Sequence, residues 1–139
     1  MLQSYTLNAS GLAVVTDQNL NFENNLVLTG CTATHTAGGT TIALNKPGYY
    51  MVHFNGYGAT TTTAGEVTVT MYINGEEAPY AAASAYSGAA TDVVNLAFST
   101  LVQVRPSCPS IDNAVRLTFV NEGVDATYNM YNVVVTKIC

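Results

Sequence analysis

Short runs of β-branched and aromatic residues recur along the whole chain, and they constrain the fold more than any other feature. The clearest run, residues 66–74, alternates apolar side chains with mostly polar ones. Its apolar positions are Val67, Val69, Met71 and Ile73. A period of two places every second side chain on the same face of a β-strand. Since no segment shows the period of a helix, the sequence predicts an all-β protein.

Further strands are predicted where such runs are bounded by Gly, Pro or Asn. They cover residues 26–28, 40–44, 49–54, 94–104, 115–119 and 128–138. Asn74-Gly75 indicates a hairpin turn, because both residues tolerate a positive φ. Residues 78–91, rich in Ala, Ser and Tyr, predict a loop and one weak strand. About eight short strands at this spacing are typical of an antiparallel sandwich or barrel.

The low charge of the chain limits the partners that it can have. Only 9% of residues are charged, while 48% are hydrophobic, and this balance excludes disorder driven by charge. The formal net charge is −5, with four scattered basic residues. We expect no nucleic-acid partner, because neutralising phosphates supplies most of the non-specific affinity for nucleic acids. Interface cores are depleted in charge, so this composition favours burial against another copy or a larger assembly.

At 139 residues the chain has the length of one domain. Residues 1–25 are expected to form an N-terminal arm or a first strand, and residues 26–139 the β-domain. The chain does not open with a basic region followed by an apolar stretch, and no run approaches the ~20 apolar residues of a membrane span. Neither a signal peptide nor membrane insertion is therefore expected. The odd number of cysteines favours free thiols, with a Cys31–Cys108 bridge as the alternative.

No residue pattern indicates a catalytic, cofactor or metal site, and we expect a protein that is not an enzyme and has no cofactor. Ser99, His53 and Asp92 are the residues from which a triad could be drawn, but no motif supports one. Glu76 and Glu77 are neighbours in an extended chain, where adjacent side chains point apart, so they make a poor acid–base pair.

A few other polar and aromatic residues are candidates for ligand contacts. Oxygen ligands for calcium could come from Asp112, Asn113, Glu122 and Asp125, although nothing in the sequence defines their geometry. His35 lies in a turn rich in Thr and Gly and is expected to face solvent. Tyr80 and Tyr86 could stack on sugars or anchor a protein partner, but tyrosine is also common on sheet surfaces.

Residues 28–139 contain a series of short sequence patterns in a characteristic order. Thr34–Gly39 precedes a strand that ends at Leu44, and Gly48-Tyr49-Tyr50-Met51-Val52 begins the next with a Gly-x-Tyr-x-hydrophobic pattern. A strand ending in Ile73-Asn74-Gly75, the long strand 94–104 and the closing run Tyr131–Ile138 follow. In this order they resemble the tumour-necrosis-factor-like and complement-globular-head superfamily. The nearest members are the knobs of collagen-like spore-coat glycoproteins and related phage structural proteins.

The resemblance implies a jelly roll of eight to ten strands that assembles as a homotrimer about a three-fold axis. In this superfamily one face of the Gly-x-Tyr strand points towards that axis. The corresponding residues here are Tyr49, Met51 and His53, and those expected to join them from the last strand are Tyr131, Val133 and Val135. Two neighbouring strands that are apolar on both faces need a partner to cover them.

We therefore expect a non-enzymatic, trimeric structural protein of a bacteriophage virion, either a capsid decoration protein or a head- or tail-fibre knob. It would be assembled in the host cytoplasm and exposed on the virion surface. Residues 1–25 are the expected contact with other virion proteins, including the capsid. The alternative is a host-adhesion or carbohydrate-binding module on a bacterial cell or spore surface. In that case Tyr80 and Tyr86 would contact a host glycan or protein.

Overall fold

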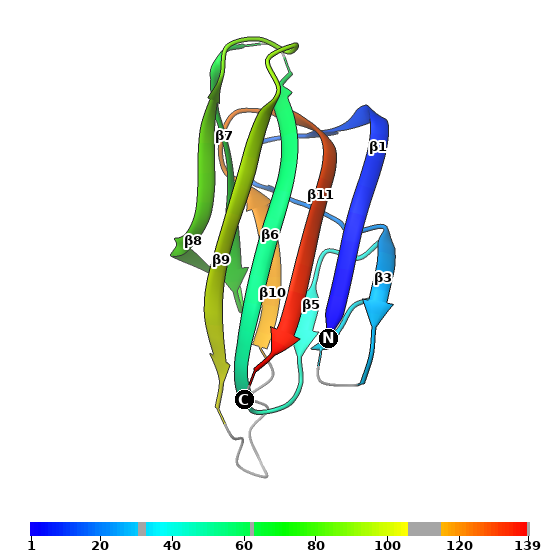
Figure 1. Cartoon of the computed structure of the whole chain (residues 1–139). Helices are drawn as coiled ribbons and strands as arrows, with labels where there is room; N and C mark the ends of the chain where they lie inside the picture. Colours follow the sequence, from blue (N-terminus) through cyan, green and yellow to red (C-terminus); the bar gives the residue numbers. More distant parts are fainter. Residues whose placement is uncertain (31–32, 62, 106–114, 139) are drawn as a thin grey trace.

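Two antiparallel β-sheets pack face to face and make up the described chain (Figure 1). The computed structural model describes residues 1–30, 33–61, 63–105 and 115–138, except for the side chains of residues 8–12. Within these ranges it contains eleven strands and no helix, which confirms the all-β prediction. The number of strands exceeds the predicted eight to ten because the structure includes three very short strands. These strands, β2, β4 and β5, have only two or three residues each. The same residues include no helix long and apolar enough to cross a membrane.

Each sheet combines strands from distant parts of the sequence. The five-stranded sheet has the order β3 (Asn24–Leu28), β1 (Leu2–Val14), β11 (Ala126–Lys137), β6 (Gly48–Thr60) and β9 (Val94–Val104). The six-stranded sheet has the order β4 (Ala33–Thr34), β5 (Ile42–Leu44), β10 (Val115–Asn121), β7 (Gly65–Ile73) and β8 (Glu76–Ser87). Its sixth strand, β2 (Gln18–Asn19), pairs with β10. Non-consecutive neighbours in both sheets are typical of a jelly roll.

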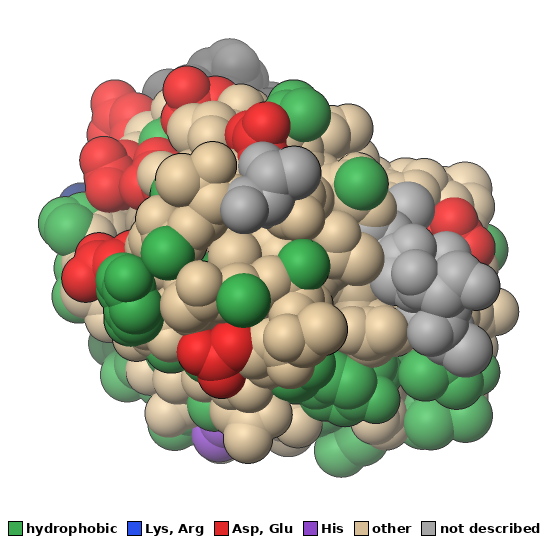
Figure 2. All heavy atoms as spheres, turned by 90° about the horizontal axis from the view of Figure 1, so that it is seen from above, with side chains coloured by type: hydrophobic (Ala, Val, Ile, Leu, Met, Phe, Trp, Pro, Cys, Tyr) green, Lys and Arg blue, Asp and Glu red, His purple; other side chains and the backbone are tan. Residues whose placement is uncertain are grey.

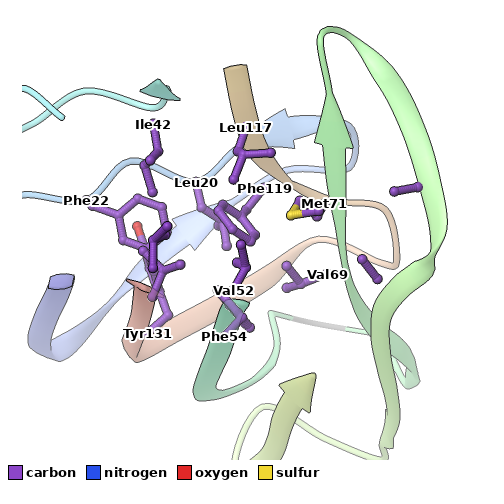
Figure 3. Close-up of a cluster of buried hydrophobic side chains, with 14 of the residues drawn as sticks. Leu20, Phe22, Ile42, Val52, Phe54, Val69, Met71, Leu117, Phe119 and Tyr131 are labelled. Carbon is purple, nitrogen blue, oxygen red and sulfur yellow. The ribbon is translucent and has the colours of Figure 1, made fainter. Parts of the chain in front are cut away.

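The core lies between the inner faces of the two sheets, where aromatic rings from both meet (Figure 3). Phe54 of β6 stacks on Phe119 of β10 with ring centroids 5.4 Å apart, and Phe22 packs edge-on against Tyr131 at 5.3 Å. Aromatic pairs in these arrangements contribute about 0.5–1.5 kcal/mol each beyond the apolar area that they bury. The core contains apolar residues of β6, β7, β9 and β10, which correspond to four of the predicted strands.

Residues 1–25 belong to the sandwich, where they contribute the strand β1 and the segment that follows it. β1 lies between β3 and β11, with pairs from Leu2↔Val135 to Val14↔Ala126. Leu2 is fully buried, and Phe22, beyond the strand, contributes a ring to the core. Removing this segment would expose apolar surface and unpair two strands, so no domain boundary falls near residue 25.

β8 is a continuous strand of twelve residues where a loop with one weak strand was predicted. Its alanines, including the buried Ala78 and Ala81, have low strand propensity, so the local sequence signal is weak. The strand forms because it pairs with β7. The two strands meet at the predicted hairpin turn, where Asn74 and Gly75 have φ values of 51° and 83°.

Candidate functional site

On the outer face of the five-stranded sheet, the described outward side chains of the four long strands are uncharged. Its outward positions were identified from strand register and from burial, which alternates along each strand. They include Gln3, Tyr5, Tyr49, Met51, His53, Asn55, Ala97, Ser99, Leu101, Asn132, Val134 and Thr136. None of these residues is Asp, Glu, Lys or Arg. We call this surface the uncharged face, and interface cores are likewise depleted in charge.

Three amide side chains on the uncharged face are hydrogen-bonded to one another. Gln3 donates to the Asn132 Oδ1 atom at 3.1 Å, and Asn132 Nδ2 donates to Asn55 Oδ1 at 3.0 Å. This row of amides crosses β1, β11 and β6. Because these three amides already have partners, their burial would cost less free energy than that of unpaired amides.

A shallow hollow of about 550 Å³ lies in the middle of the uncharged face. It forms where the small side chains of Ala97 and Ser99 on β9 lie opposite Asn55 and His53 on β6. Figure 2 views the sandwich from one end. The lower edge of this view shows hydrophobic and uncharged side chains, whereas the acidic side chains gather elsewhere. The hollow gives the uncharged face a shape into which a neighbouring surface could fit.

The structure places only half of the predicted interface residues on this face. Tyr49, Met51 and His53 point outward from β6, and Tyr49 is 41% exposed. That these three form an interface stays a prediction.

Tyr131, Val133 and Val135 are buried in the core, so their predicted outward placement is wrong. The outward side chains of this part of β11 are instead those of Asn132, Val134 and Thr136. The polar character of Asn132 and Thr136 is the signal that could have identified the outward positions, because their partners in the alternation are all apolar.

The outer face of the six-stranded sheet differs from the uncharged face because it carries a cluster of acidic groups. The Tyr72 hydroxyl donates a hydrogen bond to the Glu122 carboxylate, and this bond is the main reason why the pKa of Tyr72 rises to about 12. A hydrogen bond with Glu122 also raises the pKa of Glu77. Glu77 therefore interacts with Glu122, the residue directly after β10, and not with its sequence neighbour Glu76.

The oxygen ligands considered for calcium are not brought together in the described residues. Asp125 accepts hydrogen bonds from the backbone and the hydroxyl of Thr16, at 2.9 and 3.1 Å, while Glu122 faces Tyr72. Asp112 and Asn113 lie outside the described residues, as do Cys31, Cys108 and Cys139. Among the residues that are described, no three His, Cys, Asp or Glu side chains are arranged to hold a metal ion.

The structure also separates the three residues from which a catalytic triad could be drawn. Ser99 lies opposite His53 in the β6–β9 ladder. Asp92, however, lies in the turn before β9, where its carboxylate accepts a hydrogen bond from the backbone N–H of Gly88 at 2.8 Å. Ser99 lies seven positions beyond Asp92, which corresponds to about 20 Å where the chain is extended.

His35 is buried, at 6% exposure, so the prediction that it faces solvent is wrong. Its Nδ1 atom lies 2.6 Å from Asn25 Oδ1, and its Nε2 atom lies 2.9 Å from the carbonyl oxygen of Gly39. The ring also packs edge-on against Phe22. The imidazole therefore links its own loop to β3, an arrangement that depends on contacts distant in the sequence.

Tyr80 and Tyr86 are 67% and 65% exposed on β8, which is an edge strand of its sheet. Exposed aromatic side chains on an edge strand are available to a partner. A ligand role for these two tyrosines stays a prediction.

Comparison with known proteins supports the fold. No protein-family model matches the chain, and no curated protein matches it. Eiger TNF from S. frugiperda is similar with a TM-score of 0.67 and 12% identity, over 99% of this chain and 92% of that one. The PRD1 vertex protein P5 is similar with a TM-score of 0.59 and 16% identity, over 99% and 96%. Murine APRIL at pH 5.0 has a TM-score of 0.57 and 9% identity, over 99% and 98%.

These likenesses and the sheet topology define the class of the protein as an antiparallel β-sandwich. More particularly, the chain has the tumour-necrosis-factor-like jelly-roll fold, as the order of its sequence patterns predicted. At identities of 9–16% the likeness extends to the fold alone.

Proposed function

We propose that the chain is a non-enzymatic structural protein of a bacteriophage virion and that it assembles as a homotrimer through the uncharged face. The observation that carries the proposal is this face itself, which includes four long strands and no Asp, Glu, Lys or Arg among the outward positions named above. A second copy of the chain presents the same kind of surface. Closed three-fold symmetry would then bury all copies of the face together.

The size of the uncharged face suits such an assembly. Four strands spaced about 4.8 Å apart and about 35 Å long present an area of about 700 Å². A stable interface buries about 800 Å² on each partner. The described part of the face, together with side chains at its rim, therefore has the area that a stable interface requires.

The placement on a particle is supported by the likeness in fold to the PRD1 vertex protein P5. Contact with other virion proteins through residues 1–25 must use side chains that are exposed while β1 stays in its sheet. Val15, at 55% exposure, is one such residue. A detached arm would require breaking the pairs between β1 and both of its neighbours.

Light scattering after size exclusion tests the trimer. Three copies of a chain of 14.7 kDa would give a mass of about 44 kDa. A clean monomer at low micromolar concentration would overturn the three-fold assembly. Mass spectrometry of purified particles from cells that carry the gene tests the virion role, and a particle without this chain would overturn it.

A second candidate function is host adhesion from a cell, spore or particle surface, and the exposure of Tyr80 and Tyr86 favours it. Binding of the purified chain to host cells would then fall when both residues are changed to alanine. Ser84→Ala, on the same strand between them, is the matched control. Binding that the double variant leaves unchanged would count against this function.

A further inference from the structure

A polar groove of about 680 Å³ runs along β10 on the outer face of the six-stranded sheet. Its origin lies in the pairing of the strands. On one side β10 is bordered by β7 over five residue pairs. On the other side it pairs with two very short strands, β5 at residues 115–117 and β2 at residues 120 and 121. Thr118 lies in the interval between them and lines the resulting depression, which we call the β10 groove.

Residues from three separate segments form the walls of the β10 groove. Tyr72 of β7 lies directly opposite Thr118 in the ladder. Asp17 and Asn19 come from the turn that contains β2. The backbone N–H of Asp17 donates to the carbonyl oxygen of Asn121 at 2.7 Å, and Asp17 has a φ of 67°. This turn therefore holds the Asp17 carboxylate against the end of β10.

Several polar side chains of the groove have no protein partner. In the described part of the chain, no hydrogen bond involves the side chains of Asp17, Asn19 or Thr118. The Tyr72 hydroxyl, by contrast, already donates to Glu122. The unused groups comprise a carboxylate, an amide and a hydroxyl, so together they offer both donors and acceptors to a ligand.

The charges around the groove restrict the class of ligand. Asp17, Glu77 and Glu122 act on the Tyr72 side of the groove, where their negative charge disfavours phosphates and acidic sugars. Arg116 also lines the groove and disfavours a simple cation. An uncharged polyhydroxyl ligand is disfavoured by neither kind of charge. Each of its hydroxyls can both donate and accept a hydrogen bond. Val120 in the floor offers an apolar contact for its C–H groups.

We propose that the β10 groove binds an uncharged saccharide, with Asp17, Asn19 and Thr118 as its hydrogen-bonding residues. The volume of the groove lies within the range of about 300–1,000 Å³ that is usual for small-ligand sites. The groove and the uncharged face lie on opposite sides of the sandwich, since they belong to the outer faces of different sheets. A trimer assembled through the uncharged face would leave three grooves accessible, and the binding proposal does not depend on the trimer.

The test is calorimetric titration of the purified chain with gluco-, manno-, galacto- and xylo-oligosaccharides and with chitotetraose. Sialylated and uronic-acid oligosaccharides of similar length serve as charged comparisons. Asp17→Asn removes the charge and keeps the turn, since asparagine tolerates a positive φ. Thr118→Val removes the hydroxyl at nearly constant volume. Thr68→Val is the matched control, because Thr68 lies on the same outer face, outside the groove.

We expect at least one uncharged oligosaccharide to bind saturably and the charged ones to bind at least tenfold more weakly. Asp17→Asn and Thr118→Val should each lower the affinity about tenfold, the effect of losing one good hydrogen bond. Thr68→Val should leave the affinity unchanged. The proposal is overturned if no member of the panel binds, if acidic sugars bind best, or if both groove variants bind as the wild type does. Light scattering on the same samples reports the trimer separately, so either proposal can fail alone.

Discussion

Replacing Val134 by aspartate should disrupt assembly without disrupting folding. The reason is that adjacent residues of β11 point to opposite sides of the sheet, one to the uncharged face and the other to the core. Val134 is half-buried on the uncharged face, whereas Val133 is fully buried in the core. In the monomer, a carboxylate at position 134 keeps its access to water, and the free energy of unfolding should change by less than about 1 kcal/mol. In the trimer the same carboxylate is desolvated in all three copies.

The size of the effect on assembly follows from that desolvation. At about 2 kcal/mol for each of three unpaired carboxylates, the association constant for the trimer falls about 10⁴-fold. Val133→Asp should behave differently, because it loses about 1.5–3 kcal/mol of apolar burial and places an unpaired charge in the core. Together these losses approach the entire stability of a small domain, so this variant should not fold.

Light scattering and urea denaturation followed by circular dichroism measure both effects. Val134→Asp should run as a folded monomer of 14.7 kDa. Val93→Asp is the matched control, because Val93 is 53% exposed outside the uncharged face, and it should remain a trimer. A Val134→Asp variant that stays near 44 kDa, three times the mass of the chain, would refute the assignment of this face to the interface.

Three further predictions concern stability. Gly58→Ala would place a methyl group 2.4 Å from the carbonyl oxygen of Thr127. Thermal unfolding should therefore show that the free energy of unfolding falls by about 1–3 kcal/mol. An unchanged melting temperature would contradict this prediction. His35→Ala removes the imidazole partner of Asn25, and urea titration should show that the free energy of unfolding falls by about 1–3 kcal/mol. Replacing a solvent-facing histidine would change the free energy of unfolding very little. Because Glu122 raises the pKa of Glu77, the folded state binds more protons than the unfolded state, and stability falls as pH rises above 4.5. Glu77→Gln should therefore melt higher than the wild type at pH 7 and equally at pH 4, and no difference at pH 7 would count against the pair.

Local alternation determined much of the fold from the sequence alone. In β7, the apolar side chains of Val67, Val69 and Met71 were predicted to share one face, and all three are fully buried. The same reasoning held for β10, because these strands are apolar on one face and polar on the other. A one-residue shift would move the entire apolar set into water, so the pattern determines which side chains face the core. The hairpin at Asn74-Gly75 was also predictable, because it depends only on local backbone preference.

Alternation alone was insufficient where both faces of a strand carry apolar residues. On β11, Tyr131 and Val134 are both hydrophobic, and only pairing with β1 and β6 decides which one enters the core. His35 was misplaced for a related reason, since Asn25 and Phe22 reach it only after the sheets have formed. β8 was underestimated because its alanines carry little strand preference without β7 beside them.

The two candidate surfaces show the same division between sequence and structure. The sequence determined that the surface would be poor in charge and that Tyr49, Met51 and His53 share one strand face. Only the tertiary structure decided that Asn132 and Val134 join them, and that Asp17 lies beside a groove whose floor includes Thr118. The physical reason is that strand pairing joins residues about a hundred positions apart. Such contacts depend on the complementarity of complete sheets, which no local window of the sequence contains.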